Sequence, residues 1–187
     1  MNEKREDYKR MNIRRAVASD LDAVISIYNE IHTAEEAGLI TIGWDRYIYP
    51  TMVTAKTAIE RDDLFVLISE RDIVGSAIIN KIQVDAYCSA NWTYKADDDR
   101  VMVLHTLSIS PKTSGKGYGT AFVEFYETYA SEQGCDTLRI DTNARNLVAR
   151  RLYKKLGYTE VDIIPTVFNG LEGVDLVLLE KRIADKC

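Results

Sequence analysis

The sequence predicts a mixed α/β (α+β) fold in which helices cover both faces of one sheet. Apolar runs of strand length alternate with amphipathic helical segments in the order βααβββαβαββ. The chain has 187 residues, close to the roughly 150 of a typical domain. Hydrophobic residues make up 46% and charged residues 28%, which is typical of a globular domain with its own core.

The first half of the chain predicts a short strand, two helices and a hairpin. Residues 1–11 are rich in charge and are expected to form a flexible tail, which leaves one domain over residues 12–187. A strand is expected over residues 13–17. Ser19–Asp20 then caps a helix whose apolar residues recur at helical spacing. The other elements expected in this half are a helix over 51–61 and paired strands over 64–68 and 73–82.

The second half begins with an irregular stretch, residues 84–100, which holds several aromatic residues and an acidic run typical of a solvated loop. A β-rich strand over residues 101–109 ends before Pro111. A glycine-rich loop then leads into an amphipathic helix that stops near Gly134. The remaining expected elements are a strand over 138–141, a helix over 146–156 ending at Gly157, and strands near 158–164 and 174–180.

Composition excludes several classes of protein. The 24 Lys and Arg against 29 Asp and Glu give a net charge of -5, which argues against binding nucleic acid through bulk charge and agrees with a cationic substrate. Three cysteines at long spacings and two histidines without ligand spacing predict neither a disulfide framework nor a metal site. No apolar run suggests a signal peptide or a membrane span, so a reduced, cytoplasmic protein is expected.

The most informative segment is Ser114-Gly115-Lys116-Gly117-Tyr118-Gly119-Thr120, between a strand and a helix. Glycines at alternate positions let successive N–H groups point to one place, and the helix behind them adds a partial positive charge. These features predict a phosphate-binding loop, with Lys112 and Lys116 nearby. Neither the Walker A pattern nor the GxGxxG dinucleotide pattern fits this spacing. The alternative is a turn that merely connects the strand to the helix.

A second segment, Asn146 to Tyr158, forms the helix after the next strand. At 100° per residue, one helical face carries Asn146, Ala149, Arg150 and Tyr153. An adjacent apolar stripe, expected to face the sheet, consists of Val148, Leu152 and Leu156. Considered singly, Tyr153 would be a core aromatic residue and Asn146 a helix cap.

Together the two segments resemble the GCN5-related N-acetyltransferase (GNAT) superfamily. Its loop pattern [Q/R]xxGx[G/A] matches residues 114–119, except that Ser114 replaces the first residue. Its NxxAxxLYxKLGF-like pattern matches seven positions, with Tyr158 as the final aromatic residue: Asn146, Ala149, Leu152, Tyr153, Lys155, Leu156 and Gly157. The resemblance covers about residues 12–182.

The resemblance implies a GNAT-like mixed sheet that is mostly antiparallel and whose two central strands separate. Acetyl-CoA, the co-substrate, would lie in the gap between these strands, and no metal ion is expected to take part. It implies contacts of the pantetheine arm with Leu107, Ile109 and Asn146. The pyrophosphate would lie on Ser114, Gly115, Lys116, Gly117, Tyr118, Gly119 and Thr120.

Acetyl transfer to an amine needs a proton acceptor, a donor to the carbonyl oxygen and a proton donor to the thiolate. In the family, Tyr153 corresponds to the proton donor and the N–H near Leu107 to the oxyanion donor. His105, four residues before Ile109, is the candidate base, with a structural strand histidine as the alternative. Other candidates without geometric support are Asp99, Glu35 and Glu36.

In this family the acceptor site is built from the first inter-helix segment and from loops at the far end of the sheet. The resemblance therefore implies that the acceptor site of this chain is formed by residues 32–49, 84–99 and 164–173. These segments contain Trp44, Tyr47, Tyr87, Trp92, Tyr94 and Phe168, which suit an apolar body or a cation. The function expected is N-acetylation of a primary amine on a small molecule. Acetylation of a peptide or protein amine and non-catalytic acyl-CoA sensing are the alternatives; a nucleotide switch is disfavoured. No nucleic acid or membrane partner is expected. The oligomeric state stays open, although homodimers are common in the family.

Overall fold

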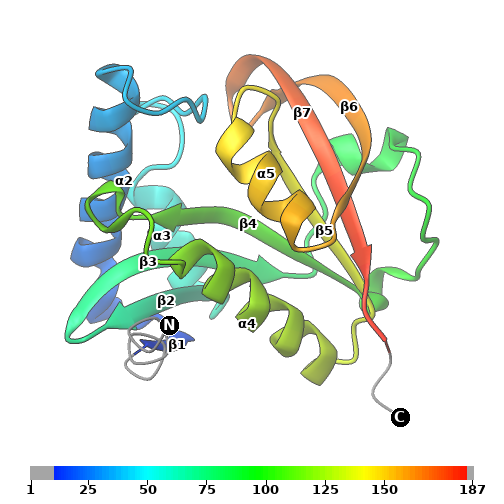
Figure 1. Ribbon diagram of the computed structural model, residues 1–187, viewed down its shortest axis with the longest axis horizontal. Coiled ribbons are helices and arrows are strands. Elements are labelled where there is room, and N and C mark those ends of the chain that lie inside the picture. Colours follow the sequence, from blue (N-terminus) through cyan, green and yellow to red (C-terminus); the bar gives the residue numbers. More distant parts are fainter. Residues whose placement is uncertain (1–10, 185–187) are drawn as a thin grey trace.

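One seven-stranded sheet organises the chain, with the strands in the order β1-β2-β3-β4-β5-β7-β6. A computed structural model describes residues 11–184 (Figure 1). The pair β4–β5 is parallel and the other neighbouring strands are antiparallel. The strands are β1 (Met11–Arg15), β2 (Leu64–Ser69), β3 (Asp72–Asn80), β4 (Val101–Ile109), β5 (Thr137–Asn143), β6 (Thr159–Phe168) and β7 (Leu171–Arg182).

Helices cover both faces of this sheet, which confirms the predicted fold class. Along the chain the strands and helices follow the predicted order βααβββαβαββ. Short 3-10 turns lie between them, among them Asp85–Ser89 and Asp98–Arg100 in the stretch expected to be irregular. The helices are α2 (Leu21–Glu36), α3 (Met52–Glu60), α4 (Tyr118–Glu132) and α5 (Leu147–Lys155).

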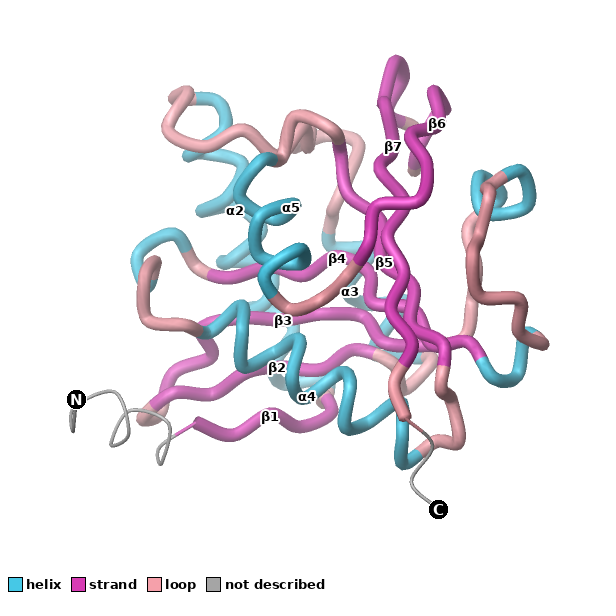
Figure 2. Tube along the Cα trace, turned by 45° about the vertical axis from the view of Figure 1, so that its right-hand side comes forward, coloured by secondary structure: helices cyan, strands magenta, loops and turns pink. Residues whose placement is uncertain are grey.

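Alternation along β2 shows how the two layers form. Phe65 and Leu67 pack in the cluster that contains α4 and Tyr153 of α5, whereas Leu64 and Val66 pack in the cluster of α2 and α3. Successive side chains of a strand point to opposite faces, so one strand serves both layers. Figure 2 shows α4 and α5 in front of the sheet and α3 behind it.

Some bounds differ from the prediction. The first strand runs over Met11–Arg15 instead of 13–17, so Met11 belongs to the sheet, and the predicted tail otherwise lies outside the described residues. The last two strands are longer than expected and join at Asn169 and Gly170, both with positive φ. Positive φ at both residues of a two-residue turn matches the right-handed twist of the strands, so pairing continues to Phe168 and Leu171.

The strands β4 and β5 separate halfway along the sheet. They pair only where Val101–Leu104 lies against Thr137–Ile140. Between His105 and Ser108 the pairing of β4 with β3 shifts, and Thr106 has a φ of 52°, which marks a bulge that bends the strand. Figure 1 shows β4 and β5 diverging from their paired ends. The backbone of β4 that faces this opening is therefore not paired with β5.

The helices of residues 11–184 include none with the length and apolar character needed to cross a bilayer.

Candidate active site

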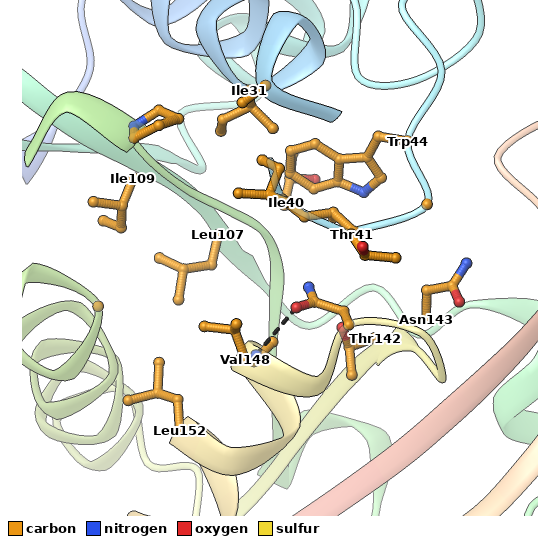
Figure 3. A pocket seen from close by; sticks show the side chains of 18 of the residues that line it. Ile31, Ile40, Thr41, Trp44, Leu107, Ile109, Thr142, Asn143, Val148 and Leu152 are labelled. Carbon is orange, nitrogen blue, oxygen red and sulfur yellow. Dashed lines mark hydrogen bonds between the residues drawn. The ribbon is translucent and has the colours of Figure 1, made fainter. Parts of the chain in front are cut away.

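A cavity of about 640 Å³ opens where β4 and β5 separate. Its walls come from β4, the loop before α4, α5, the segment after α2 and the β6–β7 hairpin. Figure 3 shows Leu107 and Ile109 of β4 on one side, Val148 and Leu152 of α5 on another, and Trp44 from the segment after α2.

The structure brings to this cavity the residues predicted for cofactor binding from 107 to 146, together with His105 and Tyr153. The residues predicted from the sequence that line it are His105, Leu107, Ile109, Ser114, Gly115, Lys116, Gly117, Tyr118, Gly119, Thr120, Asn146 and Tyr153. Lys112 is instead paired with Glu30 of α2, at 2.7 Å between Nζ and Oε1. Location at the cavity is observed; the roles of these residues stay predictions.

The loop before α4 offers unpaired backbone donors. The first backbone bond of the helix runs from Ala121 N to Gly117 O, and no acceptor among residues 11–184 takes the N–H groups of 115–120. Gly115 and Gly117 have φ values of 81° and 82°, a conformation that suits glycine and curls the loop. Unpaired N–H groups at the positive end of a helix form a site for an anion such as a phosphate.

α5 combines a cap with an apolar wall. Asn146 Oδ1 accepts a hydrogen bond from Ala149 N at 3.1 Å, so Asn146 is a helix cap as well as a cavity residue. Val148, expected to face the sheet, is instead 75% exposed and points toward the cavity in Figure 3. Gly119 lets α4 approach α5 closely, because a Cβ there would lie 3.2 Å from Leu152 Cδ2.

Tyr153 is buried where α5 faces the cavity. Its ring packs edge-on against Tyr158, with centroids 6.0 Å apart, and it belongs to the main core cluster. Burial and the nearby charge of Asp141 raise the pKa of the Tyr153 phenol above its ordinary value. The hydroxyl therefore keeps its proton at neutral pH and can donate it.

His105 lies half-buried on β4, with Nε2 3.0 Å from the Ile82 carbonyl oxygen and 3.2 Å from Asn80 Oδ1. The Asn80 amide nitrogen donates to Asp63, so Oδ1 is its acceptor atom. Both neighbours of Nε2 are acceptors, so Nε2 carries the proton and Nδ1 does not. Burial lowers the pKa of His105 to about 4, which keeps the imidazole neutral at pH 7.

Asp141, at the cavity end of β5, is a site residue that the sequence reasoning missed. Its Oδ2 accepts a 2.8 Å hydrogen bond from the Tyr87 hydroxyl. Burial raises the pKa of Asp141 to about 6, although the bond from Tyr87 opposes this shift. The sequence did contain a signal for this residue: a carboxylate stands at the end of an apolar strand, and that strand leads toward the predicted site.

The predicted acceptor aromatics separate into two groups. Trp44 and Phe168 line the cavity, together with Tyr49, which lies in the predicted segment 32–49 but was not singled out. Tyr87 is buried beneath Asp141. Outside the cavity lining, Tyr47 is 88% exposed, Trp92 stacks with the Arg139 guanidinium 4.1 Å from its ring centroid, and Tyr94 lies beside Arg182.

The remaining acidic candidates for the base lie outside the cavity lining. Glu35 accepts the backbone N–H groups of Ile42 and Gly43 and so holds the segment after α2. Glu36 pairs with Arg46 at 2.8 Å. Asp99 lies exposed beside the distal end of β4.

No cluster of three or more potential His, Cys, Asp or Glu metal ligands occurs within residues 11–184. Cys88 is exposed and Cys135 is buried, and both are free thiols; Cys187 lies outside the described residues.

The split sheet, with unpaired N–H groups at a helix N-terminus beside the opening, defines a class of α/β domain, and sequence comparison identifies the family. The acetyltransferase (GNAT) family matches residues 21–158, from the start of α2 to the residue before β6. The chain therefore belongs to the GNAT family of acetyltransferases.

Individual relatives agree with this family. An uncharacterized N-acetyltransferase of Methanocaldococcus jannaschii is 24% identical over 159 residues, which cover 83% of this chain. The match spans 64% of that relative, which is less than two-thirds of its length. The uncharacterized N-acetyltransferase YhfO of Bacillus subtilis is 25% identical over 150 residues, which cover 80% of this chain and 91% of YhfO.

Solved structures show the same fold. A GNAT-family acetyltransferase from Streptococcus agalactiae has a TM-score of 0.78 at 21% identity, covering 93% of this chain and 96% of its own. The structure of yncA from Salmonella typhimurium, determined with its cofactor acetyl-CoA, has a TM-score of 0.65 at 19% identity and covers 95% of this chain and 96% of its own.

Proposed function

We propose that this protein transfers an acetyl group from acetyl-CoA to a primary amine by direct attack of the amine on the thioester. The observation that supports this most is the opening between β4 and β5, with the unpaired N–H groups of residues 115–120 at its edge. The donors of this loop suit a pyrophosphate, and the separated strand edge suits an amide-containing arm. Binding of acetyl-CoA by the similar protein yncA is in accord with this assignment.

The binding residues follow from this arrangement. The backbone of residues 114–120 would hold the pyrophosphate, with the Lys116 ammonium adding charge at the same loop. Leu107 and Ile109 would contact the pantetheine arm through the strand edge that β5 leaves open. Because the Asn146 Oδ1 atom is used in the cap, its amide nitrogen is the atom that would donate to the arm.

In the reaction a C–N bond forms and the C–S bond breaks. An acceptor that enters as an ammonium ion loses one proton before the attack and a second as the amide forms, and the thiolate gains one. We assign the last proton to the Tyr153 hydroxyl, because Tyr153 lines the cavity and its phenol is protonated at neutral pH. A backbone N–H near Leu107 would stabilise the negative charge on the carbonyl oxygen.

We retain His105 as a candidate for the group that receives the proton of the amine. Its Nδ1 atom is unprotonated because Nε2 donates to Ile82 and Asn80. With a pKa of about 4, this imidazole is a weak base, and we assign it the transfer of the proton through an ordered water. Replacement of His105 by Gln keeps a polar side chain, and an unchanged turnover would remove His105 from the reaction.

The acceptor is proposed to be a small molecule. An aromatic wall of Trp44, Tyr49 and Phe168 at the cavity favours a compact acceptor over an extended peptide. We further propose that residues 12–187 form one domain and that the protein acts in the cytoplasm.

Release of free thiol from acetyl-CoA, measured with a panel of primary amines, tests the function. Turnover with at least one amine is the expected outcome, with N-acetylated product confirmed by mass spectrometry. Binding of acetyl-CoA without turnover of small amines, peptides or proteins would favour the sensor alternative. Failure to bind acetyl-CoA would refute the assignment of the 114–120 loop.

A further inference from the structure

The Asp141 carboxylate faces the cavity without a cationic partner. Its side chain receives one hydrogen bond, from the Tyr87 hydroxyl, and forms no ion pair with any of residues 11–184. A carboxylate removed from water is costly unless a cation or several donors compensate it. Asp141 lines the cavity and is only partly buried, so a cation bound in the cavity can supply that compensation.

Three phenols surround this carboxylate. The charge of Asp141 raises the pKa values of Tyr49, Tyr87 and Tyr153, so all three side chains lie within its electrostatic reach. Tyr153 is the proposed proton donor of the reaction, and Tyr49 belongs to the aromatic wall. Asp141 is therefore near both the proposed proton donor and the aromatic wall, and all three groups line the same cavity.

The acceptor wall is aromatic and apolar. Trp44 packs edge-on against Tyr49 at 6.1 Å between ring centroids, and Tyr49 packs edge-on against Phe168 at 6.2 Å. The Tyr49 hydroxyl is hydrogen-bonded to Thr106 at the bulge of β4, which holds this ring beside the split. The apolar residues that complete the wall are Leu171, Val174 and Leu176.

We propose that the acceptor is a monoamine with an apolar, preferably aromatic, body, whose ammonium group pairs with Asp141 while its body lies against Trp44, Tyr49 and Phe168. The inference rests on the proposed acetyl transfer and specifies its substrate class. An ammonium ion compensates the buried carboxylate, and the rings accept a flat apolar group.

The charges of the cavity exclude other amines. Among its described lining residues, Asp141 is the one carboxylate, and Lys116, in the proposed phosphate loop, is the one Lys or Arg. The carboxylate of an amino acid would therefore enter the apolar wall without a cation to pair with. The second ammonium of a diamine would likewise find no second carboxylate.

A matched panel tests this class. It contains 2-phenylethylamine, phenylalanine, which adds a carboxylate to the same body, 1,4-diaminobutane, and a short peptide with a free N-terminus. We expect kcat/KM for 2-phenylethylamine to exceed the others by about tenfold or more, since each competitor leaves a charged or polar group unpaired. A higher kcat/KM for phenylalanine, the diamine or the peptide overturns the inference, as does binding of acetyl-CoA without turnover of the monoamine.

Substitution of the carboxylate is the second measurement. Asp141→Asn keeps the shape and should lower kcat/KM for 2-phenylethylamine by about 30-fold or more, as for the loss of one member of a buried charge pair. Asp99→Asn, on the exposed loop outside the cavity, is the matched control and should change nothing. Binding of acetyl-CoA by Asp141→Asn, within about twofold of the unmodified protein, shows that the fold and cofactor site persist.

The outcomes distinguish failure of the proposed substrate class from failure of the proposed acetyl transfer. If Asp141→Asn binds acetyl-CoA and acetylates the monoamine at the original rate, the assignment of Asp141 is wrong and the transferase function stands. If the unmodified protein does not bind acetyl-CoA, the proposed function itself is wrong.

Discussion

At the scale of single residues, the two sides of the split sheet supply different chemistry. Tyr153 enters the cavity from α5, which packs with the α4 layer, whereas Asp141 meets Tyr87 on the side of the aromatic wall. A protonated phenol and an ionised carboxylate can stay close at neutral pH because the negative charge holds the proton on the phenol. This arrangement places the proposed proton donor and the proposed ammonium-binding group in one site.

Replacement of Tyr153 by Phe tests the proton donor. We expect kcat to fall about 100-fold or more, the usual range for loss of a general acid, with the Kd of acetyl-CoA unchanged within about twofold. Steady-state kinetics and calorimetric titration measure the two quantities. Tyr158→Phe is the matched control, because the Tyr158 ring packs against Tyr153 but does not line the cavity. An equal loss in kcat and in binding would indicate that Tyr153 only shapes the site.

The raised pKa of Asp141 predicts that the stability of the fold depends on pH. Its pKa in the folded protein, about 6, is above its ordinary value of 3.8, so the ionised form destabilises the fold, and stability rises as pH falls from above 6 toward 4. The groups facing it, Tyr49, Tyr87 and Tyr153, all have raised pKa values and stay neutral in this range.

Asp141→Asn should therefore raise the Tm by about 2–4 °C at pH 8, the equivalent of about 1 kcal/mol, and by less at pH 5. Scanning calorimetry of both proteins at the two pH values measures the difference. The same shift at pH 5 and pH 8 would show that Asp141 does not titrate between them.

Part of the site could be read from local sequence and part could not. Asn146 and Tyr153 lie on one short helix, so spacing alone placed them together, and the glycine loop is a local pattern. Tyr87 lies 54 residues from Asp141, and Tyr49 lies 57 residues from its partner Thr106. These pairs form only when the sheet assembles, and no local periodicity records them.

At the scale of elements, the conformation of the loop before α4 and its proposed binding of acetyl-CoA both depend on Gly117. Gly117 stands at the N-cap of α4 with a φ of 82°, which a β-branched residue adopts only with strain. Gly117→Val should lower stability by about 1–2 kcal/mol and abolish acetyl-CoA binding, because its side chain would enter the phosphate cradle. Titration calorimetry measures the binding.

Gly134 offers a matched control for this strain. It has a φ of 76° after α4, no atom lies within 4 Å of an added Cβ, and it does not line the cavity. Gly134→Val should therefore reproduce the loss of stability and retain acetyl-CoA binding. Retained binding by Gly117→Val would contradict the cradle.

Local sequence patterns predicted the order and approximate bounds of the helices and strands. They did not predict how the irregular stretch, residues 84–100, is held in place. Val101–Ile109 matches its predicted bounds, because an apolar β-rich run ends at Pro111. In residues 84–100, Thr93 and Tyr94 donate backbone N–H groups to the buried Glu180 carboxylate of β7. Trp92 and Tyr94 thus anchor a loop, a role that depends on a strand far along the chain.

At the scale of the whole molecule, the split divides the sheet into two parts with limited pairing between them. The strands β1–β4 form one part and β5–β7 the other, and backbone pairing joins them only along Val101–Leu104 and Thr137–Ile140. The core cluster that includes Leu104, Phe122 and Ile140 spans the junction from the α4 side. A ligand that fills the opening would contact both parts and add a second connection.

Binding of acetyl-CoA should therefore stabilise the whole fold. At a concentration of 100 times the Kd, a ligand that binds only the native state adds about 2.7 kcal/mol, or roughly 5–10 °C in Tm for a chain of this size. A thermal-shift titration measures this rise, and it should be lost in Gly117→Val. ATP and GTP, which offer phosphates without a pantetheine arm, should give a much smaller shift at equal concentration. An equal shift with ATP or GTP would mean that the loop binds phosphate while the strand edge contributes nothing, and the protein would then be a nucleotide-binding domain on a transferase fold.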